Sequence, residues 1–495
     1  MADFKFSIIT AIFNNERYLE ESIESVINQD IGFKDNVQLI LVDDGSTDKS
    51  LDIARSYEEK YPDNILALSK ENGGVASARN LGLKHVRGKY VNFFDSDDKL
   101  SPNTLSVIDC FLKEHPEVNV VSMPLKFFDK REGDHYLNYK FEEEGIIDLD
   151  EKFDYPQMSM ASSFVDISSI KDYEFNTQLV NGSDSQLLNR VLIDENRYGV
   201  VNKTHYNYRK RQEESSIMDT AKFSKRFFTQ KMRLYYKHLI DECLEKRGEV
   251  IPYIQYLVLL DMGGIIKTPD FDNVFDTSEE INEFWQCMDD ILVHIDENII
   301  LSHRYYNHDE KMFIIYLKNR DFHSETNPKK SKAWLKSNDR AINRLHKHNI
   351  HIDYIKTERN NLVVDGFFSS NCRYESISIK AVTDSGNVYA GKRIESKYED
   401  RGVKSYLGID WKFKYNFSIK IPLNSDDFSF RLFVEFSEDD KFIEMFSDVD
   451  FKNHSNITQE NPSIMYKSHN ISFNDNEFHV VKCSLKDRLK SKFSG

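Results

Sequence analysis

Three polar clusters in the first hundred residues each follow a short apolar run, and their side chains are of the kinds that bind nucleotides and metal ions. They are Thr10–Asn15, Asp43–Asp48 and Asp95–Asp98. In an open α/β sheet, ligands bind in the crevice outside the carboxyl ends of the strands. We therefore expect the three clusters to converge on one crevice.

The Asp95-Ser96-Asp97-Asp98 run has the spacing of a divalent-cation site. On a bend after a strand, the carboxylates of Asp95 and Asp97 can both face one ion. Mg²⁺ and Mn²⁺ prefer oxygen ligands and often take one or two carboxylates together with substrate phosphates. Such an ion would offset the charge of a diphosphate and stabilise a departing nucleoside diphosphate.

Each cluster also has a purely structural interpretation. Asp43–Asp48 could be a turn followed by a helix N-cap, and Asp95–Asp98 could be a second turn. The glycine-rich segment Glu71–Asn80 lacks the lysine of a phosphate-binding loop and could be an ordinary loop-to-helix junction. Its glycines permit close approach to a ligand, and Arg79 offers a fork of hydrogen-bond donors. Two acidic clusters that each follow an apolar strand favour the functional interpretation.

The elements that must position these clusters alternate along residues 1–220. Apolar runs over 6–13, 39–42, 65–68 and 90–94 predict strands. Helical spacing of apolar residues predicts helices over 19–27, 49–60 and 75–86. Strands that alternate with helices predict an α/β fold with a doubly wound, mostly parallel sheet.

The remaining chain changes character twice. With 495 residues the chain is expected to hold roughly three domains. Residues 221–345 predict a helical region, and short strands separated by turns over 346–455 predict a β-sandwich. Residues 456–495 are polar and then basic, and we interpret them as a tail.

Composition narrows the class of protein. Lys and Arg number 66 against 82 Asp and Glu, a net charge of −16 that argues against a nucleic-acid partner. The five cysteines form no CxxC pair, so free thiols are expected rather than a zinc site or a disulfide framework. We find no signal peptide and no apolar window of about 18 residues. These features predict a cytoplasmic protein.

Four ordered motifs resemble glycosyltransferase family 2. They are FSIITAIFNNERYLEESIESVINQ, LILVDDGSTD, ENGGVASARNLGL and YVNFFDSDD, and the resemblance covers residues 5 to 215. This is a family of inverting, nucleotide-sugar-dependent enzymes with the GT-A fold. The chain is most similar to members that build or decorate Gram-positive wall teichoic acid and bacterial capsules.

The resemblance implies a nucleotide pocket and a donor-sugar site at the three clusters. The residues that would line the nucleotide pocket are Thr10, Ala11, Phe13 and Asn14. Asp43 would hold the base, with Asp44 and Ser46 near the ribose. The residues that would flank the nucleotide and the donor sugar are Gly73, Gly74, Arg79 and Asn80. Asp95, Ser96 and Asp97 would form the DxD-type motif, with Asp97 the direct ligand of Mn²⁺ or Mg²⁺.

The resemblance also implies a catalytic base and a basic segment. Asp184, in Gly182-Ser183-Asp184, is assigned as the base; a helix N-cap is the structural alternative, and the absence of the commoner Glu-Asp pair leaves a shifted register open. Arg209 and Arg211 would contact the donor diphosphate. Ser215 and Ser216 stand where some relatives carry a metal-binding histidine, which leaves a metal ligand from this segment open.

The expected partners are a UDP-sugar donor and a glycopolymer or lipid-linked acceptor. The basic residues of the 480–495 tail are Lys482, Lys486, Arg488, Lys490 and Lys492. They predict either an amphipathic helix on the inner face of the plasma membrane or a solvated linker to a further domain. The β-sandwich could mediate homo-oligomer formation.

Two other functions stay open. A nucleotidyltransferase would use the same acidic strand ends, but it usually carries a glycine-rich, lysine-containing loop that is absent here. An inactive GT-A scaffold or carbohydrate-binding protein would not need Asp95, Asp97 and Asp184, all of which are present.

Overall fold

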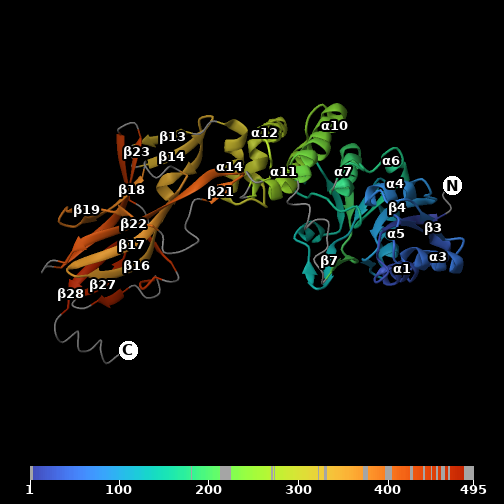
Figure 1. The fold of residues 1–495 in the computed structure, drawn as a ribbon, viewed down its shortest axis with the longest axis horizontal. Coiled ribbons are helices and arrows are strands. Elements are labelled where there is room, and N and C mark those ends of the chain that lie inside the picture. The colour runs from blue at the N-terminus through green and yellow to red at the C-terminus, as the bar shows by residue number, and fades with distance from the viewer. Residues whose placement is uncertain are drawn as a thin grey trace, which may run out of the picture. The chain divides into compact units, whose positions relative to one another are not determined.

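The structure is a computed structural model of the 495-residue chain. The residues that it describes are 4–179, 181–211, 225–268, 271, 274–320, 323–327, 332–371, 377–395, 404–423, 427–438, 441–446, 449–452, 455–458, 463–466 and 469–483. The chain forms two compact units (Figure 1). The first comprises residues 1–265 and 273–306, and the second comprises residues 266–272 and 307–495.

An eight-stranded sheet organises the first unit, in the order β3-β2-β1-β4-β10-β6-β11-β9. Its strands are β1 (Phe4–Ile12), β2 (Val37–Asp43), β3 (Ile65–Ser69), β4 (Gly88–Asp95), β6 (Val120–Ser122), β9 (Gly145–Asp148), β10 (Ser163–Asp166) and β11 (Arg197–Val200). Strands β3, β2, β1 and β4 pair in parallel, whereas β10 is antiparallel to both of its neighbours, β4 and β6. The predicted α/β, mostly parallel sheet is confirmed, with antiparallel pairs on one side of it.

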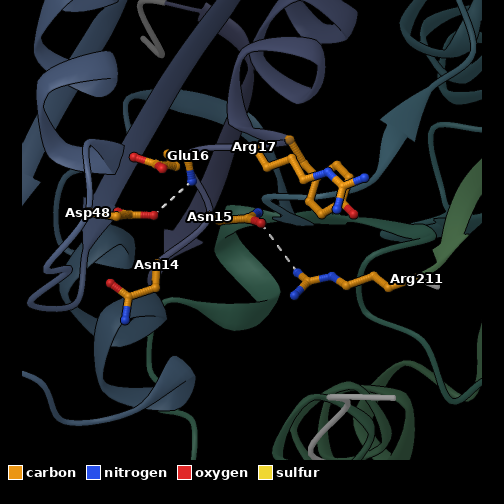
Figure 2. Close-up of a pocket in the computed structure, with 7 residues that line it drawn as sticks. Asn14, Asn15, Glu16, Arg17, Asp48 and Arg211 are labelled. Carbon is orange, nitrogen blue, oxygen red and sulfur yellow. Dashed lines mark hydrogen bonds between the residues drawn. The ribbon is translucent and has the colours of Figure 1, made fainter. Parts of the chain in front are cut away.

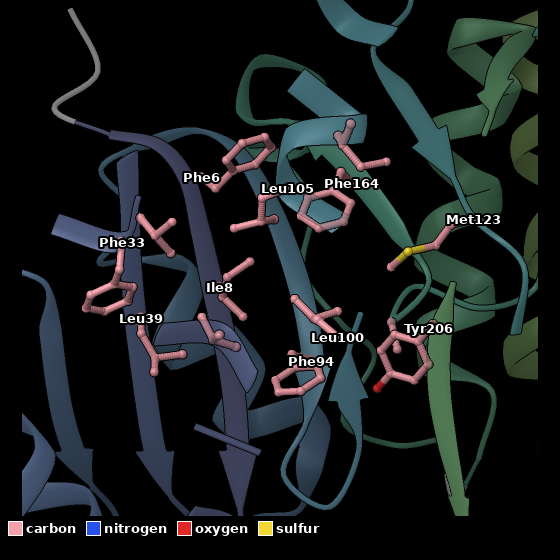
Figure 3. Packing of buried hydrophobic residues seen from close by; sticks show 14 of the residues in the cluster. Phe6, Ile8, Phe33, Leu39, Phe94, Leu100, Leu105, Met123, Phe164 and Tyr206 are labelled. Carbon is pink, nitrogen blue, oxygen red and sulfur yellow. The ribbon is translucent and has the colours of Figure 1, made fainter. Parts of the chain in front are cut away.

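Helices cover both faces of this sheet. They are α1 (Leu19–Ile27), α2 (Phe33–Asn36), α3 (Ser50–Lys60), α4 (Val75–Leu83), α5 (Thr104–Glu114), α6 (Ile167–Ile170) and α7 (Ser183–Glu195). Phe6 and Ile8 of β1 point into a core that α1 and α5 close (Figure 3). Ile9 points to the opposite face, where Gly82 of α4 lies so close that a Cβ would be 2.5 Å from the Ile9 side chain. This alternation along β1 produces the layered arrangement.

A second, four-stranded sheet in the first unit runs β5-β12-β7-β8. Its strands are β5 (Lys99–Leu100), β7 (Leu125–Asp129), β8 (Gly133–Asp134) and β12 (Tyr206–Lys210). The pairing of Tyr206 with Leu100 brings the basic segment after β12 beside the acidic cluster that precedes β5. The 3₁₀ helix η1 (Asn138–Phe141) follows β8.

A helical layer completes the first unit. It comprises α9 (Lys225–Lys231), the π-helical turn η2 (Met232–Lys237), α10 (His238–Arg247), α11 (Pro252–Ile266), α12 (Ser278–Leu292) and α13 (Glu297–Ser302). Helix α10 packs against α7 (Figure 1). None of the helices in the described ranges is both long enough and apolar enough to span a membrane.

The second unit contains α14 (His308–Asn319) and a three-stranded sheet of β13 (His323–Asn327), β14 (Lys332–Ser337) and β15 (Arg340–Arg344), followed by the 3₁₀ turn η5 (Leu345–Lys347). The predicted helical region therefore ends too late. The last described α-helix ends at Asn319, where Arg320 adopts a left-handed conformation with φ of 52°. Strands follow, and the polar turn Asn338-Asp339, with φ of 46° and 61°, joins β14 to β15 as a hairpin.

Two larger sheets of the second unit share one apolar core, as the predicted β-sandwich requires. The six-stranded sheet runs β20-β22-β17-β16-β25, with β21 paired to β22. Its strands are β16 (Ile350–Glu358), β17 (Asn361–Ser370), β20 (Lys392–Arg393), β21 (Lys404–Tyr406), β22 (Ile409–Pro422) and β25 (Val449–Phe451).

The other large sheet runs β19-β18-β23-β28-β27-β26, with β24 paired to β23. Its strands are β18 (Ile377–Thr383), β19 (Val388–Ala390), β23 (Phe428–Glu438), β24 (Lys441–Phe446), β26 (Ser463–Tyr466), β27 (His469–Asn474) and β28 (Glu477–Lys482). The expectation of a tail from residue 456 is wrong as far as Lys482, because Ile471, Phe478 and Val480 belong to the buried core. The basic residues Lys486 to Lys492 lie outside the described residues.

Candidate active site

The three polar clusters lie at one edge of the eight-stranded sheet. In the parallel register, Ile12 of β1 pairs with Asp43 of β2, and Ala11 pairs with Asp95 of β4. The residues that follow each strand therefore emerge side by side, as expected for the carboxyl edge of a parallel sheet.

Hydrogen bonds tie the first two clusters together. Asn14 adopts a left-handed conformation with φ of 48°, and its Oδ1 accepts a hydrogen bond from the Thr47 backbone N–H at 2.8 Å. The Asn14 backbone N–H donates to Ser46 Oγ at 3.0 Å. The carboxylate of Asp43 is buried and accepts from the Ser46 backbone N–H at 3.3 Å. Asp43, Ser46 and Asn14 thus form one connected wall.

Asp44 holds the glycine-rich loop. Its Oδ1 accepts hydrogen bonds from Lys70 Nζ at 2.8 Å and from the Gly73 N–H at 3.0 Å, and its Oδ2 accepts from the Gly74 N–H at 2.7 Å. Gly74 has a φ of 86°, a conformation that glycine adopts readily. Both oxygens of Asp44 are engaged by the loop itself, whereas the sequence resemblance placed this carboxylate toward a ribose.

The acidic cluster after β4 is enclosed by arginines. Arg79 Nη2 donates to Asp95 Oδ1 at 2.7 Å, and its guanidinium lies over the Phe175 ring, 5.5 Å from the centroid. Arg211 contacts Asp97 Oδ2 through Nε and Nη2, each at 2.7 Å. Ser96 Oγ accepts from Asn15 Nδ2 at 2.7 Å, which fixes the bend between the two carboxylates.

The charges of two carboxylates act on a third, Asp95, in this region. Burial raises the pKa of Asp95 to about 6, the Arg79 guanidinium opposes that rise, and the charges of Asp97 and Asp184 add to it. Asp184 comes from α7, far along the chain, yet its charge acts on Asp95. The fold therefore brings the predicted base and the predicted DxD-type motif to the same site.

Asp184 lies in the first turn of α7 and is partly exposed. The N-cap residue of that helix is Gly182, in the left-handed conformation, so the N-cap alternative for Asp184 is wrong. A left-handed residue at this position favours glycine because it has no Cβ to clash.

Arg209 has a structural role that the sequence did not reveal. Its Nε donates to the Asp97 carbonyl at 2.7 Å, and its backbone N–H donates to Asp98 Oδ1 at 2.7 Å. The guanidinium lies between the rings of Tyr18 and Phe128, 4.6 and 4.4 Å from their centroids. It also pairs with Glu21 and Asp129. Arg209 clamps the acidic loop, whereas the resemblance directed it toward a diphosphate.

A pocket of about 260 Å³ opens beside Asp97. Its lining residues are Asn14, Asn15, Glu16, Arg17, Tyr18, Asp48 and Arg211. Arg211 Nη2 reaches Asn15 Oδ1 at 3.4 Å across it, with Asn14 and Asp48 on the other side (Figure 2). Asn14 was predicted to line the nucleotide pocket and Arg211 to contact the donor diphosphate, and Asn15 belongs to the first polar cluster. Glu16, Arg17 and Tyr18 were not predicted, although they follow directly in the first motif.

The other predicted residues differ in exposure and in hydrogen bonding. Phe13 is 52% exposed beside the pocket. Thr10 is buried, and its Oγ1 has no hydrogen-bond partner in the described part of the chain. Asn80 is committed to the fold: its amide exchanges two hydrogen bonds with the Phe175 backbone, at 2.9 and 2.7 Å.

The site suits a divalent cation that is held jointly by protein and substrate. Among the described residues, no group of three or more His, Cys, Asp or Glu side chains is arranged to hold a metal alone. Asp95 and Asp97 supply two carboxylates, and the negative charges of Asp97 and Asp184 act on Asp95 in addition to the burial that mainly raises its pKa. Two carboxylates plus substrate phosphates are a usual ligand set for Mg²⁺ and Mn²⁺.

Comparison with known proteins identifies proteins that are similar in sequence to this chain. Residues 7–167 match the family model for glycosyl transferase family 2. The minor teichoic acid biosynthesis protein GgaB of Bacillus subtilis (strain 168) is 32% identical over 85% of this chain and 47% of its own length. GgaA of the same organism is 35% identical over 58% of this chain and 65% of its own. The chain thus spans about half to two thirds of these relatives.

Solved structures share the fold. The crystal structure of TarS from Staphylococcus aureus covers 98% of this chain and 86% of its own, with a TM-score of 0.52 and 17% identity. A TarS fragment in complex with UDP-GlcNAc covers 68% of this chain and 98% of its own, with a TM-score of 0.53 and 21% identity. The likeness to TarS extends over both units. It supports the predicted fold class, in which a GT-A sheet is followed by helices and then by β-sheets.

Proposed function

Since residues 7–167 form a glycosyl transferase family 2 domain, we propose that the chain moves a sugar from a UDP-sugar to a hydroxyl group of a cell-wall glycopolymer, with inversion at the anomeric carbon. The observation that carries this proposal is the convergence of Asp95, Asp97 and Asp184 at the carboxyl edge of the sheet.

Asp184 is the proposed general base. Its carboxylate takes the proton of the acceptor hydroxyl as that oxygen attacks the anomeric carbon. The bond between that carbon and the β-phosphate oxygen breaks in the same step, and UDP leaves with the bonding electrons. A single displacement of this kind inverts the configuration, because attack and departure occur on opposite faces of the sugar.

The donor site is proposed at the first two strand ends. The wall formed by Asn14, Asp43 and Ser46 faces the nucleoside. Asp95 and Asp97 would hold Mn²⁺ or Mg²⁺, which when bound offsets diphosphate charge. Arg211 can reach a phosphate group by leaving Asp97. The UDP-GlcNAc complex of TarS supports a UDP-sugar as donor.

The acceptor is proposed to be a polyol-phosphate polymer of the teichoic-acid type. This rests on relatives whose names refer to teichoic acid biosynthesis and, for S. aureus TarS, to poly(ribitol-phosphate) β-N-acetylglucosaminyl transfer. The S. aureus TarS match is 28% identical over 49% of this chain and 42% of its own length.

Calorimetric titration with a panel of nucleotide sugars tests the donor assignment. We expect one UDP-sugar to bind with Mn²⁺ and to bind at least about tenfold more weakly with EDTA, because a metal held by Asp95 and Asp97 would offset the charge of the diphosphate. The Asp97→Asn variant should bind as weakly as the EDTA sample. Binding of a free nucleotide triphosphate in preference to every nucleotide sugar would instead favour nucleotidyl transfer, and binding of none would contradict the proposal.

A further inference from the structure

The first turn of α7, which carries Asp184, packs against the π-helical turn η2. Ser185 Oγ and Tyr235 Oη are hydrogen-bonded at 2.6 Å, and both residues are buried. One residue further on, Gln186 Nε2 donates to the Leu234 carbonyl. The residue that follows the proposed base is therefore bonded directly to η2.

The residue that begins this turn also contacts Tyr235. Gly182 has a φ of 83°, and a Cβ built there would lie 3.2 Å from Tyr235 Cε1. The Tyr235 ring thus fills the space beside the N-cap, while its hydroxyl bonds to Ser185. Asp184 lies between these two points of contact along the chain.

Tyr235 lies beside a charged network, in which Lys231 Nζ is 5.8 Å from the centroid of the Tyr235 ring. Lys231 Nζ pairs with Asp261 Oδ2 at 2.6 Å, and Tyr236 Oη donates to the same oxygen at 2.7 Å. The Lys231 side chain is 6% exposed, so little solvent screens this pair. Local π-helical turns are uncommon in proteins and often occur at functional sites.

The electrostatics place the phenol close to the base and keep it protonated. Burial raises the pKa of Tyr235 well above its ordinary value, and the charges of Asp261 and Asp184 act in the same direction. The hydroxyl therefore carries its proton at neutral pH and remains a full partner in the bond to Ser185.

We propose that Tyr235 is a positioning residue for the transfer reaction, whose hydroxyl acts through Ser185 to hold the first turn of α7 so that the Asp184 carboxylate faces the acceptor hydroxyl. This inference rests on the proposed function, in which Asp184 is the base. Misplacement of a catalytic group by about 1 Å can cost a hundredfold in rate.

The test is a double-mutant cycle on the full chain. Tyr235→Phe and Ser185→Ala each remove one hydroxyl and keep the packing. We expect each variant to lower kcat about tenfold or more, to leave the UDP affinity from calorimetry within about twofold of the wild type, and to lower kcat no further when combined. Non-additivity is expected because either substitution alone breaks the same hydrogen bond.

Tyr198→Phe is the matched control. It also removes a buried tyrosine hydroxyl, but one that bonds to the Tyr155 carbonyl at 2.8 Å rather than to a residue of α7. It should lose thermal stability to a similar degree as Tyr235→Phe but keep its kcat. Stability loss alone would therefore not reproduce the expected result.

Three outcomes would overturn the inference: a wild-type kcat for Tyr235→Phe, equal loss of kcat in Tyr198→Phe, or fully multiplicative effects in the double variant. The Asp184→Asn variant distinguishes failure of the positioning role from failure of the proposed function. If Asp184→Asn is inactive while Tyr235→Phe is fully active, the positioning role alone is wrong. If Asp184→Asn keeps its turnover, the base assignment fails, and the positioning role fails with it.

Discussion

At the residue scale, the acidic side chains of the site differ in what they are bonded to. Asp44 and Asp98 accept hydrogen bonds from backbone N–H groups and so hold loops in place. Asp95 and Asp97 are paired with the guanidinium groups of Arg79 and Arg211. A cation can replace a guanidinium far more easily than it can replace a backbone amide, so the second pair is the one suited to a metal.

Replacing Arg211 tests this distinction. Arg211→Gln removes the guanidinium group that is paired with Asp97 Oδ2. Mn²⁺ should therefore bind the nucleotide-free variant a few-fold more tightly than it binds the wild type. Paramagnetic resonance of free Mn²⁺ during a titration measures this affinity. Arg87→Gln, which removes the same charge from a residue bonded to the Asp63 carbonyl, should leave it unchanged. Equal or weaker Mn²⁺ binding by Arg211→Gln would contradict the competition.

The residue roles were predictable only in part. Ordered motifs identify Asp95, Asp97 and Asp184 as candidates, because residue type and spacing carry that information. The clamp formed by Arg209 joins residues 112 positions apart, and the Tyr235–Ser185 bond joins residues 50 apart. Such pairings depend on how the helices and strands pack, which one sequence does not specify.

At the element scale, the glycine-rich loop depends on a single carboxylate. Asp44→Asn keeps the side-chain shape but loses the charge that Lys70 and the Gly73 and Gly74 amides share. We expect the first unit to lose about 2 kcal/mol of unfolding free energy, as for hydrogen bonds to charged groups. Urea unfolding of the ligand-free protein measures this loss, and Asp52→Asn on the exposed side of α3 is the control. Wild-type stability together with abolished UDP binding would instead support direct ligand contact by Asp44.

Buried Lys140 gives the first unit a pH-dependent stability. Burial lowers the pKa of Lys140 to about 7, and its Nζ donates only to uncharged oxygens, the Pro156 carbonyl and Gln157 Oε1, among its described hydrogen bonds. Above pH 7 the folded protein therefore binds fewer protons than the unfolded chain, whose lysine titrates near its ordinary pKa. Stability linked to Lys140 should thus rise with pH across this window.

Lys140→Met removes that linkage. From pH 7 to pH 9, the wild-type unfolding free energy should rise by about 2 kcal/mol relative to the variant. Urea unfolding at both values, followed through the transition of the first unit, measures the difference. Parallel pH dependence of the two proteins would show that Lys140 titrates normally in the folded state.

Two missed hairpins show why element boundaries went wrong. Asn338-Asp339 joins β14 to β15, and Asp475-Asn476 joins β27 to β28, with φ positive at all four residues. Asn and Asp are enriched among residues with positive φ, which both central residues of a type I′ hairpin turn require. Residues 221–345 were instead interpreted as one helical region from their apolar spacing, and the polar composition from residue 456 suggested a tail.

At the scale of the whole molecule, the site lies within the first unit, and the second unit has a separate core. A ligand at about a hundred times its dissociation constant adds roughly 2.7 kcal/mol to the stability of the unit that binds it. In scanning calorimetry, a UDP-sugar with Mn²⁺ should therefore raise one transition by a few degrees and leave another unchanged. Equal shifts of all transitions would indicate that the donor site also involves the second unit.

The measurement that tests the central claim most directly is the initial rate of sugar transfer by Asp184→Asn, with a UDP-sugar, Mn²⁺ and a polyol-phosphate acceptor. Asparagine is nearly isosteric but cannot accept the hydroxyl proton, and a general base contributes at least about a hundredfold to rate. We predict that the variant loses at least that factor in kcat while it binds UDP and unfolds as the wild type does. Transfer within tenfold of the wild-type rate would contradict the assignment of Asp184 as the base.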